Sequence, residues 1–322
     1  MYYPYLRGRQ NELLCLRELL ENGKLGKKIV PVIEPVRFSS TFFSTLSKFI
    51  EMNRDVIVIQ NPKVGKFDKE FTEMRAKTER EGDTDKKKKL QETLEAYMEI
   101  LKNEHILAGY INDAEMVSEF LKKNKDIEDA IVINRELGNY EYYDEYGEEL
   151  VAKLTFIPND MDFKDDVSGE VAVIEDGYKK AKRNIDYLEQ PDEIFSRNHV
   201  VYKKRGYCGF CDYSIVGSEY EESGFAPLAI AIHLVYFGKK DVLRIHHFVS
   251  ESNENISDPA RKFEEAMSHL VDWENFDVIP KTTGLNNLLS YYYHGRFPGL
   301  GVIKKYSLMH HLEIINDYLG DE

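Results

Sequence analysis

The chain has 322 residues, of which 42% are hydrophobic and 31% are charged; this balance is typical of a globular protein rather than a disordered one. Its formal net charge of −14 argues against general nucleic-acid binding, because phosphate recognition depends on Lys and Arg. No run approaches the ~20 apolar residues of a membrane span, and three cysteines cannot form a disulfide framework. We therefore expect a cytoplasmic protein with no membrane partner.

One pattern recurs along most of the chain: a short apolar run that ends in a carboxylate, an amide or an Arg. Because the runs are continuous rather than alternating, they are typical of strands that are buried on both faces. Polar residues at the carboxyl ends of parallel strands are where α/β folds keep their sites. The runs occupy residues 29–34, 56–61, 107–113, 130–135, 154–160 and 171–176, with a weaker copy at 209–213.

Segments with helical periodicity lie beside these runs. Residues 10–21 carry an apolar stripe ahead of the first run, and residues 40–51 carry another behind a Ser-rich start that suits an N-cap. Further helices are predicted after the third and sixth runs, at 114–123 and 177–188. Strands that alternate with helices predict a parallel sheet with right-handed crossovers. We therefore predict an α/β fold, a (β/α)8 TIM-like barrel, with a doubly wound parallel sheet as the alternative.

Two regions interrupt the repeat. Residues from about 66 to 104 are charge-dense and predict a helical hairpin inserted between the second and third strands. Two apolar segments at about 229–248, joined by a turn that contains Gly, predict a β-hairpin, which we expect to close the barrel irregularly. C-terminal helices are predicted within about 258–319. No shift in composition divides the chain, so we predict a single domain over residues 1–322.

The cysteine and histidine patterns contain no complete catalytic or zinc motif. Cys208 and Cys211 form a lone CxxC, whereas a zinc ribbon needs two such pairs. We expect both thiols to be reduced and metal-free, and to lie on opposite faces of a strand. His246 and His247 are adjacent on a strand, so one of them at most can face a site, and we take His246 as a ligand-binding candidate. No residue is assigned as a metal ligand.

The polar residues after the strands are expected to gather at one rim of the barrel. Three carboxylates are candidates for catalysis: Glu34, Asp176 and Asp212. Glu34 is followed by Pro35, and Asp212 by an extended segment, so helix capping explains neither. Because the first strand of a barrel neighbours the last ones, the three carboxylates are predicted to lie on one side of the rim. A structural ion-pair network at the same place is the alternative.

A second set of rim residues is predicted to bind a ligand. Arg7 and Arg9 precede the first helix and can fold over the three carboxylates, where they would compensate the negative charge. Oxygen-rich surroundings of this kind suit Mg²⁺, which is the cofactor candidate. The predicted ligand-binding residues are Arg7, Arg9, Asn61, Asn112, Arg135, Glu175, Tyr213 and His246.

Short motifs spread along the chain carry a resemblance to a known family. The chain reads YPYLRGRQ over residues 3–10, PVIEP over residues 31–35 and GFCDY over residues 209–213, and the hairpin at 229–248 comes after them. On these motifs the chain resembles the “beta protein” family, a group from phages and from bacterial mobile or defence-associated gene clusters. The resemblance implies a setting in phage–host conflict, with a nuclease-like partner encoded nearby. It implies no chemistry for individual residues.

Two classes of function are compatible with these observations. In the first, the chain is a cytoplasmic component of a phage-related or anti-phage defence module, and it recognises a partner or a ligand at the barrel rim. In the second, it is a metal-dependent hydrolase, a phosphoesterase that uses the acidic ring at the carboxyl ends of the strands. The first is preferred because the sequence has neither a nucleophile–base pair nor a metal signature. The sequence alone leaves open whether the chain is an enzyme.

Overall fold

Eight parallel strands form a closed barrel in the computed structural model, which describes residues 1–113, 115–116, 130–141, 151–222 and 226–320. The strand order around the barrel follows the chain, and β9 pairs with β1 to complete the ring. The prediction of a (β/α)8 TIM-like barrel is therefore confirmed, and the doubly wound alternative is wrong. The strands are β1 (Tyr2–Leu6), β2 (Val32–Ile33), β3 (Val56–Ile59), β4 (Ile106–Ile111), β5 (Ile131–Ile133), β6 (Leu154–Ile157), β7 (Glu170–Glu175) and β9 (Gly209–Asp212).

The first strand, β1, lies where the sequence pattern predicts no strand. Its Tyr5 pairs with Val32 of β2, and its Tyr3 pairs with Cys211 of β9. Tyrosines and a proline make up this strand instead of a β-branched run, and proline is rare in central strands, so the segment lacks the usual signal. Because β1 lies between β9 and β2, the barrel closes without help from the hairpin.

The predicted hairpin exists, but it belongs to a second sheet. Strands β10 (Ala231–Phe237) and β11 (Leu243–Val249) pair antiparallel, and β8 (Asp192–Ser196) joins the free edge of β11. The prediction that the hairpin closes the barrel is wrong, because β8 provides the edge with which it pairs. The helix predicted at 177–188 is also wrong: the segment is irregular until the short 3-10 helix η2 (Asn184–Glu189).

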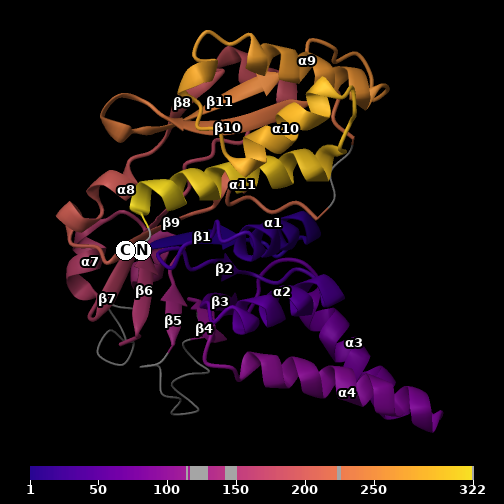
Figure 1. Cartoon of the computed structure of the whole chain (residues 1–322). Helices are drawn as coiled ribbons and strands as arrows, with labels where there is room; N and C mark the ends of the chain where they lie inside the picture. Colours follow the sequence, from indigo (N-terminus) through magenta and orange to yellow (C-terminus); the bar gives the residue numbers. More distant parts are fainter. Residues whose placement is uncertain (114, 117–129, 142–150, 223–225, 321–322) are drawn as a thin grey trace.

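The helices before and after the first predicted strand are confirmed residue for residue, as α1 (Gln10–Glu21) and α2 (Ser40–Glu51). The predicted insertion is also confirmed. Helices α3 (Phe67–Arg80) and α4 (Thr84–Leu101) follow β3 and project away from the barrel as an arm (Figure 1). The helix predicted at 114–123 lies almost entirely outside the described residues. The short elements are α7 (Met161–Asp166), α8 (Asn198–Val201), η1 (Leu137–Asn139), η3 (Lys203–Arg205), η4 (Ser214–Val216), η5 (Lys239–Asp241) and η6 (Phe276–Val278).

Three C-terminal helices complete the fold, as predicted: α9 (Pro259–Val271), α10 (Thr283–Tyr293) and α11 (Leu300–Leu319). Helix α11 lies between the barrel and the second sheet (Figure 1) and contacts α1, α10 and β10. Because it has protein on two sides, residues 306–315 are all buried, so this stretch lacks the exposed face of a surface helix. Among the described residues, no helix is long and apolar enough to cross a membrane.

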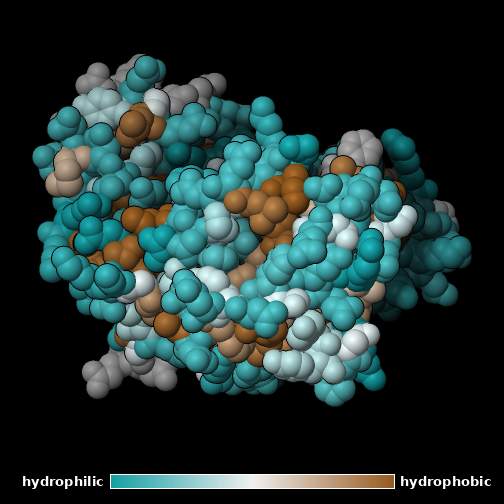
Figure 2. Space-filling view, turned by 90° about the horizontal axis from the view of Figure 1, so that it is seen from above, coloured by the Kyte–Doolittle hydropathy of each residue, from teal (hydrophilic) through white to brown (hydrophobic). Residues whose placement is uncertain are grey.

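The surface over the second sheet is largely hydrophilic. Seen from above, its apolar side chains form several separate patches rather than one continuous area (Figure 2). Continuous apolar patches are what mark large docking surfaces. The face in this view shows no continuous patch of that kind.

The barrel has two cores, separated by the alternation of side chains along each strand. Its interior is filled by a cluster that includes Tyr3, Tyr5, Val32 and Cys211. A second cluster, which includes Tyr2, packs between the strands and the surrounding helices. Because successive side chains of a strand point to opposite faces, this alternation decides which rim residues face the mouth of the barrel.

Candidate functional site

The alternation sends two of the predicted catalytic carboxylates to different sides of the barrel wall. Glu34 follows the inward-facing Val32 by two positions, and it accepts a hydrogen bond from Tyr5 of the interior. Asp212 follows the inward-facing Cys211 by one position, and it accepts a hydrogen bond from Tyr2 of the outer cluster. Glu34 therefore lies at the mouth, whereas Asp212 lies behind the wall.

Glu34 is the centre of the mouth. Its side chain is fully buried and forms an ion pair with the guanidinium of Arg7. The hydroxyl of Tyr5 donates to its Oε2 at 2.8 Å, and the backbone N–H of Lys63 donates to its Oε1 at 2.7 Å. A buried carboxylate is stable only when it is paired and hydrogen-bonded. Both oxygens of Glu34 are thus engaged, which suits a residue that orients its neighbours.

Arg7 connects this carboxylate with the loop after β9. Its guanidinium donates to Glu34 and to the backbone oxygen of Ser218, and its Cζ lies 5.1 Å and 5.5 Å from the ring centroids of Tyr5 and Tyr213. Burial raises the pKa of both tyrosines, so both hydroxyls stay protonated. The predicted ligand-binding residues Arg7 and Tyr213 therefore do meet at the mouth, although Arg7 is only 3% exposed.

Arg135 and Lys63 are the more accessible cations of the mouth. The Arg135 side chain is 27% exposed, and its Nη1 lies 4.0 Å from Oε2 of Glu34, its one ion-pair partner among the described residues. The Lys63 side chain is 29% exposed, and its Nζ lies 2.5 Å from Oδ2 of Asp113. The guanidinium of Arg135 is thus held near the mouth at a distance too long for a hydrogen bond.

The predicted amides Asn61 and Asn112 and the carboxylate of Glu175 make hydrogen bonds within the rim. Asn61 donates to the oxygen of Ile111 and accepts from its N–H, both at 2.8 Å. Asn112 donates to Asn134 at 2.7 Å. Glu175 accepts from Asn198 at 2.7 Å. These contacts give each side chain a structural task, and the ligand-binding roles of Asn61, Asn112 and Glu175 stay predictions.

Asp176 also serves the loop after β9. Its two carboxylate oxygens accept from the backbone N–H groups of Tyr178, at 2.9 Å, and of Ser218, at 2.7 Å. Since Ser218 also binds Arg7, the structure brings Asp176 and Glu34 to the same loop. Of the three predicted carboxylates, the structure links Glu34 and Asp176 through Arg7 and Ser218, whereas Asp212 faces the other way.

Asp212 belongs to a buried group that sequence reasoning missed. Its Oδ1 accepts from the Tyr2 hydroxyl and from the N–H of Ser214, both at 2.8 Å. Burial raises the pKa of Asp212 to about 7. The Ser214 hydroxyl lies 2.6 Å from Nδ1 of His311 on α11, and both residues are fully buried. A serine without access to solvent is no nucleophile, so we read this pair as a link between barrel and helix.

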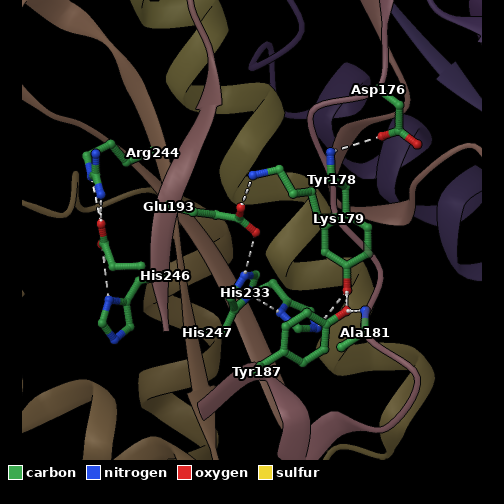
Figure 3. Close-up of polar contacts among 11 residues, drawn as sticks. Asp176, Tyr178, Lys179, Ala181, Tyr187, Glu193, His233, Arg244, His246 and His247 are labelled. Atoms are coloured by element: carbon green, nitrogen blue, oxygen red, sulfur yellow. Dashed lines mark hydrogen bonds and ion pairs between the residues drawn. The ribbon is translucent and has the colours of Figure 1, made fainter. Parts of the chain in front are cut away.

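A second buried polar group lies under the second sheet (Figure 3), at residues that the sequence assigned to the core or left open. His233 and His247 face each other through their Nδ1 atoms at 2.7 Å. Tyr178 lies 3.1 Å from Nε2 of His233 and 2.5 Å from the hydroxyl of Tyr187. Nε2 of His247 lies 3.6 Å from Glu193. We refer to these five residues as the His–Tyr cluster.

His246 and the cysteines belong neither to the contacts of the mouth nor to the His–Tyr cluster. Nδ1 of His246 lies 3.2 Å from Asp192, and its ring packs on Trp273 with centroids 4.4 Å apart, so it belongs to the second sheet. Cys208 and Cys211 are free thiols. The prediction that they lie on opposite faces is wrong: both contact the barrel interior, since β9 begins at 209 and its alternation does not include Cys208.

No described group of three or more His, Cys, Asp or Glu side chains is placed to hold a metal ion. The carboxylates of the mouth are instead matched by Arg7, Arg135 and Lys63. No family model matches the chain, and neither curated proteins nor solved structures gave a match. The function of the mouth has therefore to be inferred from its own contacts and charges.

Proposed function

We propose that the protein recognises an anionic ligand at the mouth of the barrel, with Arg135 as the residue that binds it. The observation that carries this proposal is the position of the Arg135 guanidinium, which is partly exposed and 4.0 Å from Glu34. The oxygens of Glu34 already accept from Tyr5, Lys63 and Arg7. Among the residues that the structure describes, the guanidinium of Arg135 makes no hydrogen bond, and the charge of Glu34 holds it near the mouth.

The geometry favours a ligand with a carboxylate or a phosphate group. A guanidinium presents its donors as a planar fork, which matches two oxygens of such a group. Lys63 adds a second partly exposed cation, although Asp113 shares it. Both cations lie at the carboxyl ends of barrel strands, which is where barrels of this type place their sites.

The biological setting rests on the sequence motifs alone. The resemblance to the “beta protein” family supports a role as the recognition component of a phage-related or anti-phage defence module, beside a nuclease-like partner. A metal-dependent phosphoesterase is the other candidate from the sequence. No specific contact favours it, because Glu34 is fully engaged and Asp212 points behind the wall.

Titration calorimetry with inorganic phosphate and with malonate, as a carboxylate probe, tests the proposal. We expect the parent to bind at least one of them, and Arg135→Ala to weaken that binding at least tenfold at an unchanged melting temperature. Arg183→Ala is the matched control, because Arg183 is an exposed residue paired with Asp186 at the surface. Binding of neither anion by the parent, or equal binding by Arg135→Ala, would contradict the proposal.

A test in cells addresses the setting. The gene is placed in a host together with its neighbouring genes, and phage plating is compared for the parent, Arg135→Ala and Arg183→Ala. Protection that disappears only in Arg135→Ala supports a recognition role in defence. Protection that is absent in all strains, or equal in all of them, counts against it.

A further inference from the structure

The loop after β9 carries a short acidic segment across the rim. We call residues 218–222 the acidic strap; it contains Glu219, Glu221 and Glu222. At its start, Ser218 is held on both sides: its oxygen accepts from Arg7, and its N–H donates to Asp176 at 2.7 Å. The strap is thereby fixed at the mouth before its glutamates begin.

Cations from three separate parts of the chain converge on this strap. Lys180, which follows β7, places its Nζ 2.7 Å from Glu221 and 3.4 Å from Glu219. Lys66, directly before α3, pairs with Glu222 at 2.5 Å. Arg9, directly before α1, donates to the backbone oxygen of Glu221. In a chain with a net charge of −14, such a gathering of positive charge on one rim requires an explanation.

The cations are close enough to repel one another. Packing around the ammonium group is the largest cause that lowers the pKa of Lys304, although the side chain as a whole is exposed, and the charges of Arg9 and Lys180 lower it further. Lys304 forms no salt bridge within the part of the chain that the structure describes. Besides Glu221, the nearby Glu12 partly offsets these charges. Without the strap, Arg9, Lys180 and Lys304 would form a positive cluster that Glu12 offsets only in part.

The backbone on both sides of Lys180 is fixed in advance (Figure 3). Its neighbour Lys179 forms an ion pair with Glu193 of the second sheet. Its other neighbour, Ala181, donates its N–H to the hydroxyl of Tyr187 at 3.2 Å. Lys180 therefore extends from a segment whose neighbouring residues are held by contacts outside the strap.

The strap itself is held weakly. The side chains of Glu219, Glu221 and Glu222 are 72%, 64% and 46% exposed. Ion pairs at such exposure contribute little, because water and salt compete with them. A ligand that carries several negative charges can therefore replace the three carboxylates, since it engages all the cations at once.

We infer that Arg9, Lys180 and Lys304 form a second anion site, distinct from Arg135, for a small ligand with two or more phosphate groups, and that the acidic strap fills this site as an internal competitor. Two of the three cations are lysines, which bind phosphate as point charges. The spacing of the strap's contacts along several residues fits a chain of phosphates better than a single anion. The strap then limits access until such a ligand displaces it.

Calorimetry with inorganic tripolyphosphate at low salt tests the inference. The triple variant Glu219→Gln/Glu221→Gln/Glu222→Gln removes the competitor, and we expect it to bind at least tenfold more tightly than the parent. The control is Glu92→Gln/Glu95→Gln/Glu99→Gln on α4, which changes the net charge by the same amount and affects only exposed side chains. For this control variant we expect the affinity for tripolyphosphate to change by less than twofold. Melting temperatures check that all variants fold, and the single variant Glu221→Gln replaces the triple one if it does not.

Two further variants separate this site from the mouth. Both are made in the triple Glu→Gln variant of the strap. There, Lys180→Gln/Lys304→Gln is expected to abolish the gain in tripolyphosphate affinity, whereas Arg135→Ala is expected to retain it. The inference would be overturned if the triple Glu→Gln variant of the strap bound tripolyphosphate no more tightly than the control. It would also be overturned if the gain in affinity persisted without Lys180 and Lys304. A gain lost with Arg135→Ala would assign the phosphates to the mouth and likewise overturn it.

Discussion

The barrel mouth and the His–Tyr cluster both bury polar groups, but they stabilise them in opposite ways. At the mouth, the buried carboxylate of Glu34 forms an ion pair with the guanidinium of Arg7. In the cluster, burial lowers the pKa of both histidines, so the rings are neutral. This ion pair has a further cation, Arg135, beside it, and such a site is suited to attract an anionic ligand. A cluster with neutral rings, whose one carboxylate is already paired with Lys179, is suited to join a loop to a sheet.

The hydrogen-bond directions in the cluster follow from this neutrality. The carboxylate of Glu193, 3.6 Å from Nε2 of His247, favours a proton on that nitrogen. This assigns the proton of His233 to Nδ1 and makes the Tyr178 hydroxyl the donor to Nε2 of His233. The Nδ1 proton of His233 is then shared with Nδ1 of His247, whose own proton lies on Nε2 and faces Glu193. Each of these contacts forms without a net charge on either ring, so the cluster needs no ligand to compensate it.

The largest effect is expected from removing the compensating charge at the mouth. Arg7→Met leaves the buried carboxylate of Glu34 without its ion pair, and we expect it to lower the free energy of unfolding by about 3–5 kcal/mol. Urea denaturation measures this. Arg183→Met, at an exposed ion pair, should stay within about 0.5 kcal/mol of the parent. A loss of less than about 1 kcal/mol in Arg7→Met would show that Glu34 is not held as a charged group.

Asp212→Asn tests whether Asp212 is a structural group behind the wall. Burial raises its pKa to about 7, above the value of about 3.9 in an unfolded chain. The folded state therefore holds its proton more strongly, and this stability is lost as the pH rises from about 4 through 7. The Asn side chain of the variant does not ionise in this range. Between pH 4 and pH 8, the free energy of unfolding should therefore fall by up to about 4 kcal/mol less in the variant than in the parent.

The same variant should bind phosphate within twofold of the parent, because its side chain does not reach the mouth. Urea denaturation across pH and calorimetry provide the two readouts. Parallel pH profiles, together with a lost anion affinity, would return Asp212 to the site and reject the division by strand alternation.

The His–Tyr cluster should make the protein sensitive to acid. Burial lowers the pKa of His247 to about 4, below the value of about 6.5 in an unfolded chain. The unfolded state thus takes up the proton first, and stability falls as the pH drops from about 6.5 to 4. Over this pH range, we expect the free energy of unfolding to fall by about 3 kcal/mol less in His247→Gln than in the parent. The exposed His294→Gln is the control, and a variant that follows the parent's profile would contradict the assignment.

The sequence was sufficient for the barrel but not for its mouth, and the reason is physical. Runs such as Val56–Ile59 are apolar on both faces, so they identify a buried parallel strand without revealing which side chains point inward. Glu34 and Asp212 therefore looked equivalent. Which side chains point inward is evident only from the structure, in which Tyr3, Tyr5 and Cys211 lie together in the barrel interior. Strand β1 was not predicted, because its proline and tyrosines differ from the β-branched runs of the other strands.

Contacts between distant residues set the other limit. The pair of Arg7 with Ser218 and the pair of Lys180 with Glu221 join segments that no local pattern connects. His310 and His311 likewise gave no signal, because their burial depends on α11 having protein on two sides. Glu34, Arg7 and Arg135 could be named from the sequence, and Arg7 could be placed over the rim carboxylates, but the contact of Arg7 with Ser218 and the position of Arg135 could not be predicted.

The most direct test of the central claim observes the Arg135 guanidinium while an anion binds. In ¹⁵N-labelled protein, its Nε–H signal is assigned by its loss in Arg135→Ala and followed during a phosphate titration. We predict a saturable shift of this signal, with the Arg183 signal unchanged as an internal control. An Arg135 signal that stays in place while phosphate binding saturates elsewhere would contradict the assignment of the mouth as the anion site.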